Sequence, residues 1–75
     1  MNITKTLDAK GFACPMPIVK TKKAMDTIHS GEILEVLTTD KGALSDIPAW
    51  AKSGGHIILE QKTEEDILYF YIQKA

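Results

Sequence analysis

The sequence predicts a two-layer α/β (α+β) sandwich with the order β-α-β-α-β-β, in which a four-stranded mixed sheet carries two helices on one face. Two observations lead to this prediction. Side chains alternate with a period of two near both ends of the chain, and apolar residues recur every three or four positions in two internal segments. Glycines and polar residues separate these segments. With 75 residues, 44% of them hydrophobic, the chain is expected to form one domain over 1–75.

A strand followed by a helix is expected in the first part of the chain. Residues 3–8 alternate between side chains that suit the two faces of a sheet. Gly11 allows the turn that follows. A helix is then expected from Pro15 to a stop at Gly31, because one face has helical spacing. That face comprises Ile18, Thr21, Met25 and Ile28.

The middle of the chain predicts a buried strand and a second helix. Residues 32–39 contain a nearly continuous apolar run, which is typical of a central strand. A helical apolar face follows, comprising Ala43, Leu44, Ile47, Trp50 and Ala51. Pro48 lies inside this segment, so we expect a kink there or a helix that restarts after its first turn. Gly54 and Gly55 are expected to end the helix.

The last part of the chain predicts a hairpin. Strands are expected over 56–61 and 67–73, with a polar turn over 62–66 between them. Two right-handed crossovers make the first three strands parallel, and the hairpin makes the fourth antiparallel. Four apolar residues are expected on the uncovered face, as a contact patch or, preferably, as scattered surface residues. They are Ile33, Leu37, Tyr69 and Tyr71.

Composition argues against several classes of function. The net charge is −1, with nine lysines, no arginine and ten acidic residues, so direct binding of nucleic acid is not expected. No apolar run of about 18 residues and no signal peptide is evident, so we expect a cytoplasmic protein without membrane insertion. A single cysteine forms no internal disulfide, and no cysteine–histidine spacing resembles a metal site. Neither a metal nor another cofactor is expected.

The only cysteine lies in the tetrapeptide Cys14-Pro15-Met16-Pro17, at the expected start of the first helix. Pro15 suits the first helical position, and a residue before proline favours the extended backbone of an N-cap. We therefore expect Cys14 to be the N-cap, with its sulfur over the open end of the helix. There the Met16 amide and the helix dipole would lower the pKa of the thiol. The alternative is a small buried structural cysteine.

These residues resemble the Cys-Pro-x-Pro signature of the TusA-like, also called SirA-like, sulfur-carrier family. The similarity covers essentially the whole chain, continuing through Gly31-Glu32, Asp40, Asp46-Ile47-Pro48 and Gly55-His56. The resemblance implies a βαβαββ sandwich like the C-terminal domain of a bacterial translation initiation factor. It also implies that Cys14 carries sulfur as a persulfide, while Pro15 and Pro17 set its pose. The chain departs from the tRNA-thiolation branch at Met16, where an acid is common, and at Lys22, where an arginine is common.

The predicted function is that of a sulfur carrier, or sulfurtransferase, in a sulfur relay. The Cys14 thiolate would attack a persulfide on a donor protein, either a cysteine desulfurase or a rhodanese-like protein. Because the chain has no second cysteine, the sulfur must then leave to an acceptor protein. A membrane transporter is a further possible partner.

Four charged residues are candidates for docking these partners: Lys20, Lys22, Lys23 and Asp40. The alternative for the lysines is a solvated helix face, with Lys22 paired to Asp26 one turn later. For Asp40, capping of the second helix or of its entry turn is the preferred interpretation.

Two other functions are consistent with the sequence. One is an enzyme that processes thiosulfate through an S-sulfonate on Cys14, although no residue nearby stands out as its water-activating or sulfite-stabilising group. The other is a non-catalytic redox or partner-binding regulatory module, which would have a thiol pKa near the free value of about 8.5. His29 and His56 are expected to be structural, and Ile47 and Trp50 to be packing residues.

Overall fold

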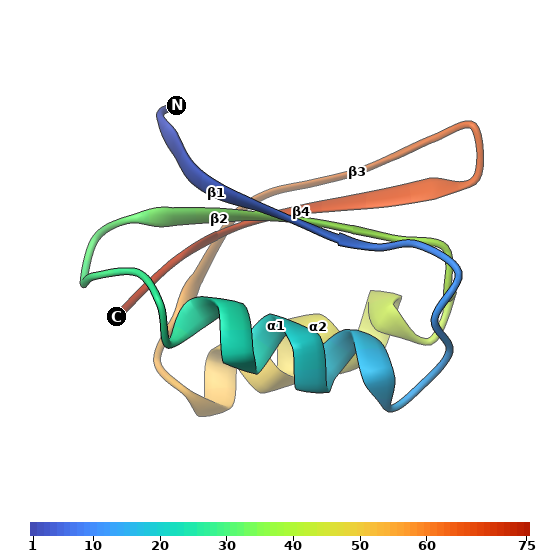
Figure 1. Ribbon diagram of the computed structural model, residues 1–75, viewed down its shortest axis with the longest axis horizontal. Helices are drawn as coiled ribbons and strands as arrows, with labels where there is room; N and C mark the ends of the chain where they lie inside the picture. The colour runs from blue at the N-terminus through green and yellow to red at the C-terminus, as the bar shows by residue number, and fades with distance from the viewer.

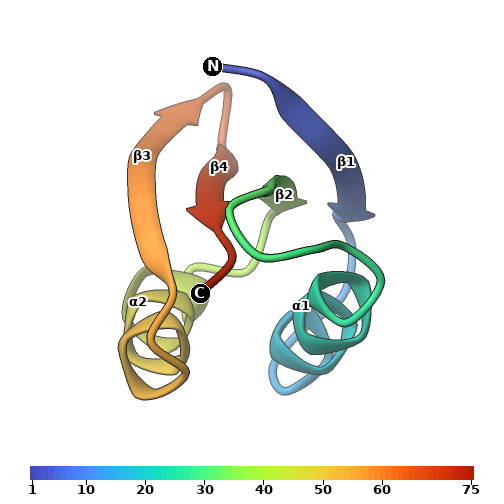
Figure 2. The ribbon, with the colours of Figure 1, turned by 90° about the vertical axis from the view of Figure 1, so that its left-hand side faces the viewer.

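In the computed structural model, which describes all 75 residues, four strands and two helices form two layers (Figure 1). The elements are β1 (Ile3–Ala9), α1 (Met16–Met25), β2 (Ile33–Thr38), α2 (Ala43–Ser53), β3 (Ile57–Glu64) and β4 (Ile67–Gln73). Both helices cover the same face of the sheet, as the end-on view shows (Figure 2). The predicted fold class and element order are therefore confirmed. Neither helix has the length and apolar character needed to cross a bilayer.

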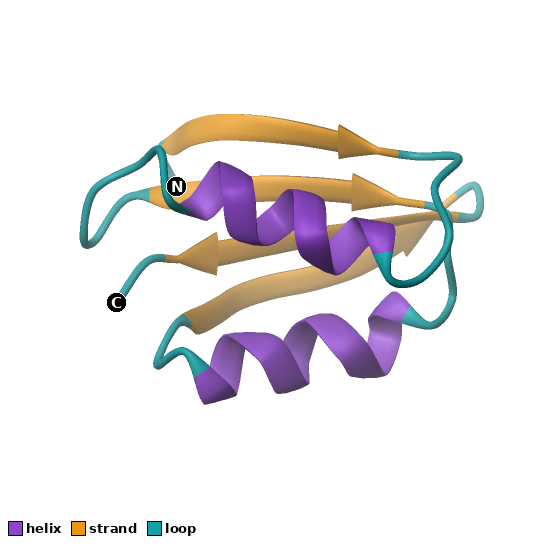
Figure 3. Ribbon diagram, turned by 60° about the horizontal axis from the view of Figure 1, so that its bottom comes forward, coloured by secondary structure: helices purple, strands orange, loops and turns teal.

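The sheet has the strand order β1-β2-β4-β3. Strand β2 pairs in parallel with β1 and antiparallel with β4, and β4 pairs antiparallel with β3. Strands β1, β2 and β3 therefore run in the same direction, as predicted. Both helices begin at the edge of the sheet where β1 and β2 end (Figure 3). This arrangement brings the β1–α1 and β2–α2 loops to one edge of the molecule.

The core lies between the sheet and the two helices. Leu34 and Val36 of β2 and Phe70 and Ile72 of β4 are fully buried on the helix side of the central strands. A fully buried aliphatic or aromatic side chain contributes about 1.5–3 kcal/mol. These residues give a small domain a continuous apolar layer. The helices add five buried residues to it: Ala24, Met25, Ala43, Ile47 and Ala51.

Helix α1 is shorter than predicted, because it ends at Met25 instead of continuing to Gly31. At this point the Thr27 amide and the Thr27 hydroxyl both donate to the Ala24 carbonyl, at 3.0 and 2.6 Å. The Ile28 amide likewise donates to the Met25 carbonyl at 3.3 Å. These i→i−3 bonds tighten the last turn and end the α-helical ladder. Ile28 is nevertheless buried, so its expected place in the core is correct.

Helix α2 runs without interruption through Pro48, so the expectation of a restarted helix is wrong. Pro48 removes only the bond to the Leu44 carbonyl, in the second turn of the helix. Leu44 was expected in the core but is 44% exposed. The buried face of α2 is Ala43, Ile47 and Ala51, and Trp50 packs against the core from a half-buried position.

The hairpin between β3 and β4 is tighter than the predicted turn over 62–66. Strand β3 extends to Glu64, and the turn consists of Glu65 and Asp66, with φ values of 51° and 65°. Two consecutive positive φ values match a type I′ turn, which asparagine and glycine usually occupy. The sequence Glu65-Asp66 carries no such signal, which explains the wrong boundary.

The uncovered face of the sheet carries the apolar residues that the strand pattern assigned to it. Leu37 lies opposite Tyr69, and Glu35 lies opposite Tyr71. The pKa of Tyr71 is raised to about 12, mainly by the hydrogen bond to Glu35 and secondly by burial of the phenol. The Lys62 ammonium lies 5.3 Å from the centre of the Tyr69 ring. Charged groups therefore interrupt the apolar residues of this face.

Candidate functional site

Cys14 lies in the β1–α1 loop, at the edge of the sheet where both helices begin, and its thiol is free and exposed. Its backbone N–H donates to Asp40 Oδ2 at 3.0 Å. Its Sγ donates to Asp46 Oδ2 at 3.5 Å. Three parts of the chain therefore meet at the thiol: the β1–α1 loop, the β2–α2 loop and the first turn of α2.

The β1–α1 loop is fastened to the end of β2. Gly11 adopts a φ of +84°, a conformation that other residues rarely take, and its N–H donates to Thr39 Oγ1 at 3.0 Å. A shallow hollow of about 250 Å³ lies beside this junction, lined by Gly11, Phe12, Ala13, Thr39 and Asp40. The site is thus an exposed edge with no deep cavity beside the thiol.

The expected N-cap role of Cys14 is wrong. Helix α1 begins at Met16, and Pro15 itself occupies the N-cap with φ −93° and ψ 7°. The Cys14–Pro15 peptide bond is cis. The Met16 amide, which was expected to face the sulfur, donates to the Ala13 carbonyl at 2.9 Å. Pro17 is buried in the first turn and lacks an N–H that would have no helical partner there.

The expectation that the pKa of the Cys14 thiol is lowered is also wrong. The hydrogen bond to Asp46 raises the pKa of Cys14, and desolvation and then the negative charges of Asp46 and Asp40 raise it further. A carboxylate beside a thiol disfavours the thiolate. The two neighbouring carboxylates therefore favour the protonated thiol of Cys14 over the thiolate in the isolated protein.

Asp40 connects the two loops of the site. One of its carboxylate oxygens accepts from the Cys14 N–H, and the other accepts from the Gly42 N–H at 3.3 Å. The second bond is an Asx turn, so Asp40 caps the entry turn of α2 as predicted. It does not cap the helix itself, whose N-cap is Gly42 without a side-chain hydrogen bond. The first bond makes Asp40 a positioning residue for Cys14, which the sequence did not indicate.

Asp46 is the site residue that sequence reasoning missed. In the sequence, Asp46 stands only within the Asp46-Ile47-Pro48 similarity, which assigns it no role. A Cβ built on Gly42 would lie 3.3 Å from Asp40 Oδ2 and 3.6 Å from Asp46 Oδ2. The two carboxylates therefore flank Gly42, next to the thiol. The sequence offered one signal for Asp46, its position in the first turn of α2, because acidic residues are favourable in the first turn of a helix.

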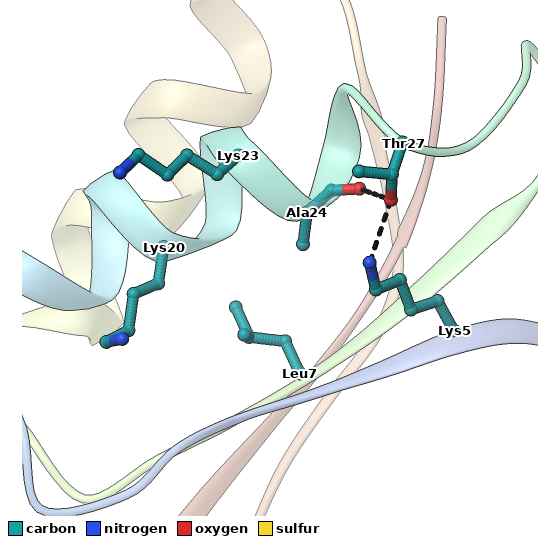
Figure 4. A pocket seen from close by; sticks show the side chains of 6 residues that line it. All are labelled: Lys5, Leu7, Lys20, Lys23, Ala24 and Thr27. Atoms are coloured by element: carbon teal, nitrogen blue, oxygen red, sulfur yellow. Dashed lines mark hydrogen bonds between the residues drawn. The ribbon is translucent and has the colours of Figure 1, made fainter.

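The three lysines of α1 do not form a single cluster. The Lys20 ammonium lies 4.3 Å from the centre of the Phe12 ring. Lys20 and Lys23 line a pocket of about 290 Å³ between α1 and β1, in which Lys5 donates to Thr27 Oγ1 at 2.9 Å. The ammonium groups of Lys5, Lys20 and Lys23 point in different directions (Figure 4). They do not converge on one position that an anion could occupy.

A second groove, of about 390 Å³, lies between the two helices. It is lined by Ile18, Val19, Lys22, Lys23, Asp26 and Trp50. Lys22 and Asp26 both border it but form no ion pair, so that predicted pair is absent; the ion pairs of the structure are Lys10–Asp8 and Lys62–Glu64.

Exposed apolar side chains occupy the segments that border Cys14. Four of them are between 38 and 44% exposed: Phe12, Met16, Val19 and Leu44. They come from the β1–α1 loop, α1 and the start of α2.

The two histidines lie elsewhere in the fold. His56 stacks on Trp50, and His29 lies in the turn between α1 and β2.

The candidate site is thus a free thiol on an exposed edge, held by two loops and bordered by apolar side chains. The chain belongs to the TusA sulfurtransferase family, whose model matches residues 5–74.

Curated relatives agree with this assignment. The chain is 66% identical to YrkI of Bacillus subtilis, a protein named as a candidate sulfur carrier, over the full length of both chains. It is 54% identical to YrkF of the same organism, of which it covers 40%. It is 41% identical to the sulfur carrier protein TusA of Allochromatium vinosum, over 92% of this chain and 91% of that one.

A solved structure has the same fold. The crystal structure of the SirA-like protein of Desulfitobacterium hafniense matches with a TM-score of 0.83 over 93% of this chain and 96% of the other. At 24% identity, this likeness concerns the fold alone.

Proposed function

We propose that this protein is a sulfur carrier that receives a sulfur atom on Cys14 as a persulfide and passes it to an acceptor protein in a sulfur relay. The observation that carries the proposal is the exposed Cys14 thiol, held at the edge of the sheet by Asp40 and Asp46 in a chain of the TusA family. Pro15, Met16 and Pro17 connect this thiol to the first turn of α1.

The transfer is a thiol exchange and needs no oxidant. The Cys14 sulfur forms a bond to the outer sulfur of a donor hydropersulfide, and the donor's S–S bond breaks. The electron pair of that bond leaves with the donor sulfur, which takes up the proton lost by Cys14. The acceptor thiol then attacks the outer sulfur on Cys14 in the same way. Because the chain has no second cysteine, release is intermolecular.

The donor and acceptor are proteins that dock over the thiol. The exposed apolar residues Phe12, Met16, Val19 and Leu44 supply contact area of the kind that protein interfaces bury at their centres. The groove with Lys22 and Lys23 adds positive charge on one side. The predicted donors are a cysteine desulfurase or a rhodanese-like protein. A cytoplasmic relay fits a single free thiol that must stay reduced.

Intact mass spectrometry tests the proposal. The protein is incubated with a cysteine desulfurase and L-cysteine, and its mass is recorded before and after treatment with a reductant. We expect a gain of one sulfur atom that the reductant reverses, and no gain in Cys14→Ser.

A relocated thiol is the matched control. Ser53 is exposed at the end of α2, so Cys14→Ser combined with Ser53→Cys offers a free thiol away from the loops. We expect loading of this variant to be at least tenfold slower. Equal loading of the relocated thiol, or no loading of the native chain, would contradict the proposal.

A further inference from the structure

We propose that Asp46, together with Asp40, selects the sulfur donor by charge: the two carboxylates keep small anionic donors such as thiosulfate away from Cys14, and leave uncharged sulfur groups presented by a docked protein as substrates. This inference rests on the proposed sulfur-carrier function of Cys14.

The geometry places one carboxylate on the reacting atom. Asp46 Oδ2 lies 3.5 Å from Cys14 Sγ, and Asp40 Oδ2 lies 3.0 Å from the Cys14 nitrogen. A group that attacks or is attacked by Sγ must come within bonding distance of that sulfur. A negatively charged reagent that bonds to Sγ therefore comes within about 6 Å of the Asp46 carboxylate, where repulsion between two unit charges, even in water, slows a reaction about threefold.

No cation balances these carboxylates in the structure. Neither Asp40 nor Asp46 forms an ion pair. The charged side chains of the two loops and the two helices are Lys10, Lys20, Lys22, Lys23, Asp40, Lys41, Asp46 and Lys52. Lys10 lies 4.0 Å from Asp8, and Lys20 lies over the Phe12 ring. Lys41 is exposed and forms no side-chain hydrogen bond or ion pair. Both carboxylates raise the pKa of the thiol, so their charge acts at the sulfur.

The two classes of donor differ in charge at the attacked sulfur. With thiosulfate, the Cys14 sulfur would bond to the outer sulfur while the sulfur–sulfur bond breaks and sulfite leaves with its electron pair. The incoming dianion must pass Asp46 and Asp40. With a neutral hydropersulfide on a docked protein, no net charge approaches the carboxylates, and the leaving group is the donor thiol.

Alkylation rates test the charge selection without any sulfur transfer. The ratio of the rate with iodoacetate, an anion, to the rate with neutral iodoacetamide is measured at one pH. Because both reagents react with the same thiolate, the ratio cancels the thiol pKa. We expect Asp46→Asn to raise this ratio about threefold. Asp26→Asn, which removes one charge at the far end of α1, should leave it unchanged.

An unchanged ratio in a folded Asp46→Asn protein would overturn the inference. Folding is checked by circular dichroism, and Asp46→Ser supplies a second variant that also removes the charge. A ratio that rises equally in Asp26→Asn would also overturn it, because net charge alone would then explain the effect.

A second measurement compares sulfur donors by intact mass. We expect the native chain to load from cysteine desulfurase with L-cysteine at least tenfold faster than from thiosulfate, and Asp46→Asn to narrow this difference. Equal loading of the native chain from both donors would contradict charge selection. If neither donor loads the chain while the alkylation ratio still responds to Asp46, the proposed carrier function fails and selection among sulfur donors falls with it, although the repulsion of anions by Asp46 stands.

Discussion

At the scale of single residues, the site depends on two aspartates that act on different atoms of Cys14. Asp40 holds the backbone and Asp46 holds the sulfur. The prolines of the Cys14-Pro15-Met16-Pro17 segment shape the start of α1, but the carboxylates decide the electrostatics of the thiol. The state of Cys14 is therefore set by residues that follow it by 26 and 32 positions in the chain.

Replacing Asp40 tests its positioning role. In Asp40→Ala, the Cys14 and Gly42 N–H groups lose their acceptor, so we expect amide exchange at Cys14 to become at least tenfold faster. The free energy of unfolding should fall by about 1–2 kcal/mol, because hydrogen bonds to a charged acceptor are lost. Exchange is followed by NMR and stability by urea denaturation. Asp26→Ala is the control, and unchanged protection of the Cys14 amide would refute the role of Asp40.

The pH dependence of Cys14 tests the role of Asp46. Since the folded state raises the thiol pKa, the rate of reaction with iodoacetamide should reach half its maximum above the ordinary value of about 8.5. In Asp46→Asn this midpoint should move to lower pH. The unfolded chain ionises first, so Cys14 lowers stability as pH rises above about 8.5. A native midpoint below the ordinary value would show that the helix dipole outweighs both carboxylates.

At the scale of secondary-structure elements, α1 contains one unsatisfied polar group. Thr21 faces the sheet with no exposed surface, and its hydroxyl has no hydrogen-bond partner. Thr27, in the turn after α1, is different, because its hydroxyl donates to the Ala24 carbonyl and accepts from Lys5. The two threonines form a matched pair for mutation.

Thr21→Val should raise the free energy of unfolding by about 1 kcal/mol. The buried Thr21 hydroxyl loses its hydrogen bonds to water on folding and gains none in the folded protein, and valine removes this desolvation penalty. Thr27→Val should lower the free energy of unfolding, since two hydrogen bonds are lost. Chemical denaturation of both variants measures these changes. A Thr21→Val protein less stable than the native one would indicate that the hydroxyl has a partner in solution.

At the scale of the whole molecule, the alternation of side chains in the strands and the helical spacing in two segments were together sufficient to predict the element order and fold class. Strand β4 has the predicted bounds, and Phe70 and Tyr71 lie on the faces that a period of two assigns to them. The predicted ends of the elements were wrong where a local hydrogen bond competed with the periodic pattern of side chains. Helix α1 ends at Met25 because Thr27 bonds to the carbonyl three residues before it.

Only the part of the site that lies next to Cys14 in the sequence was predictable. Cys14 stands out because two prolines follow it within three residues. Its contact with Asp46 exists because the β1–α1 and β2–α2 loops meet at one edge of the sheet, and no local pattern reports that meeting. The prediction that the pKa of Cys14 is lowered failed for the same reason, because it considered only the helix that follows Cys14 and not the two aspartates.

The size of the molecule fits the work of a carrier. The chain measures 29 × 22 × 18 Å and presents its thiol at an edge, so two large proteins can reach Cys14 in turn. The exposed apolar residues that border the thiol and the groove between the two helices lie on the helix layer, and the tyrosines lie on the opposite face of the sheet. Donor and acceptor are therefore expected to share one docking surface and to bind one at a time.

The most direct test of the central claim is to count transferable sulfur atoms on Cys14. The chain is loaded by a cysteine desulfurase with ³⁵S-labelled L-cysteine, separated from the enzyme and treated with cyanide, which removes outer persulfide sulfur as thiocyanate. We expect close to one labelled thiocyanate per native chain and none from Cys14→Ser. Label that is absent from the native chain, or equal in the two proteins, would contradict it.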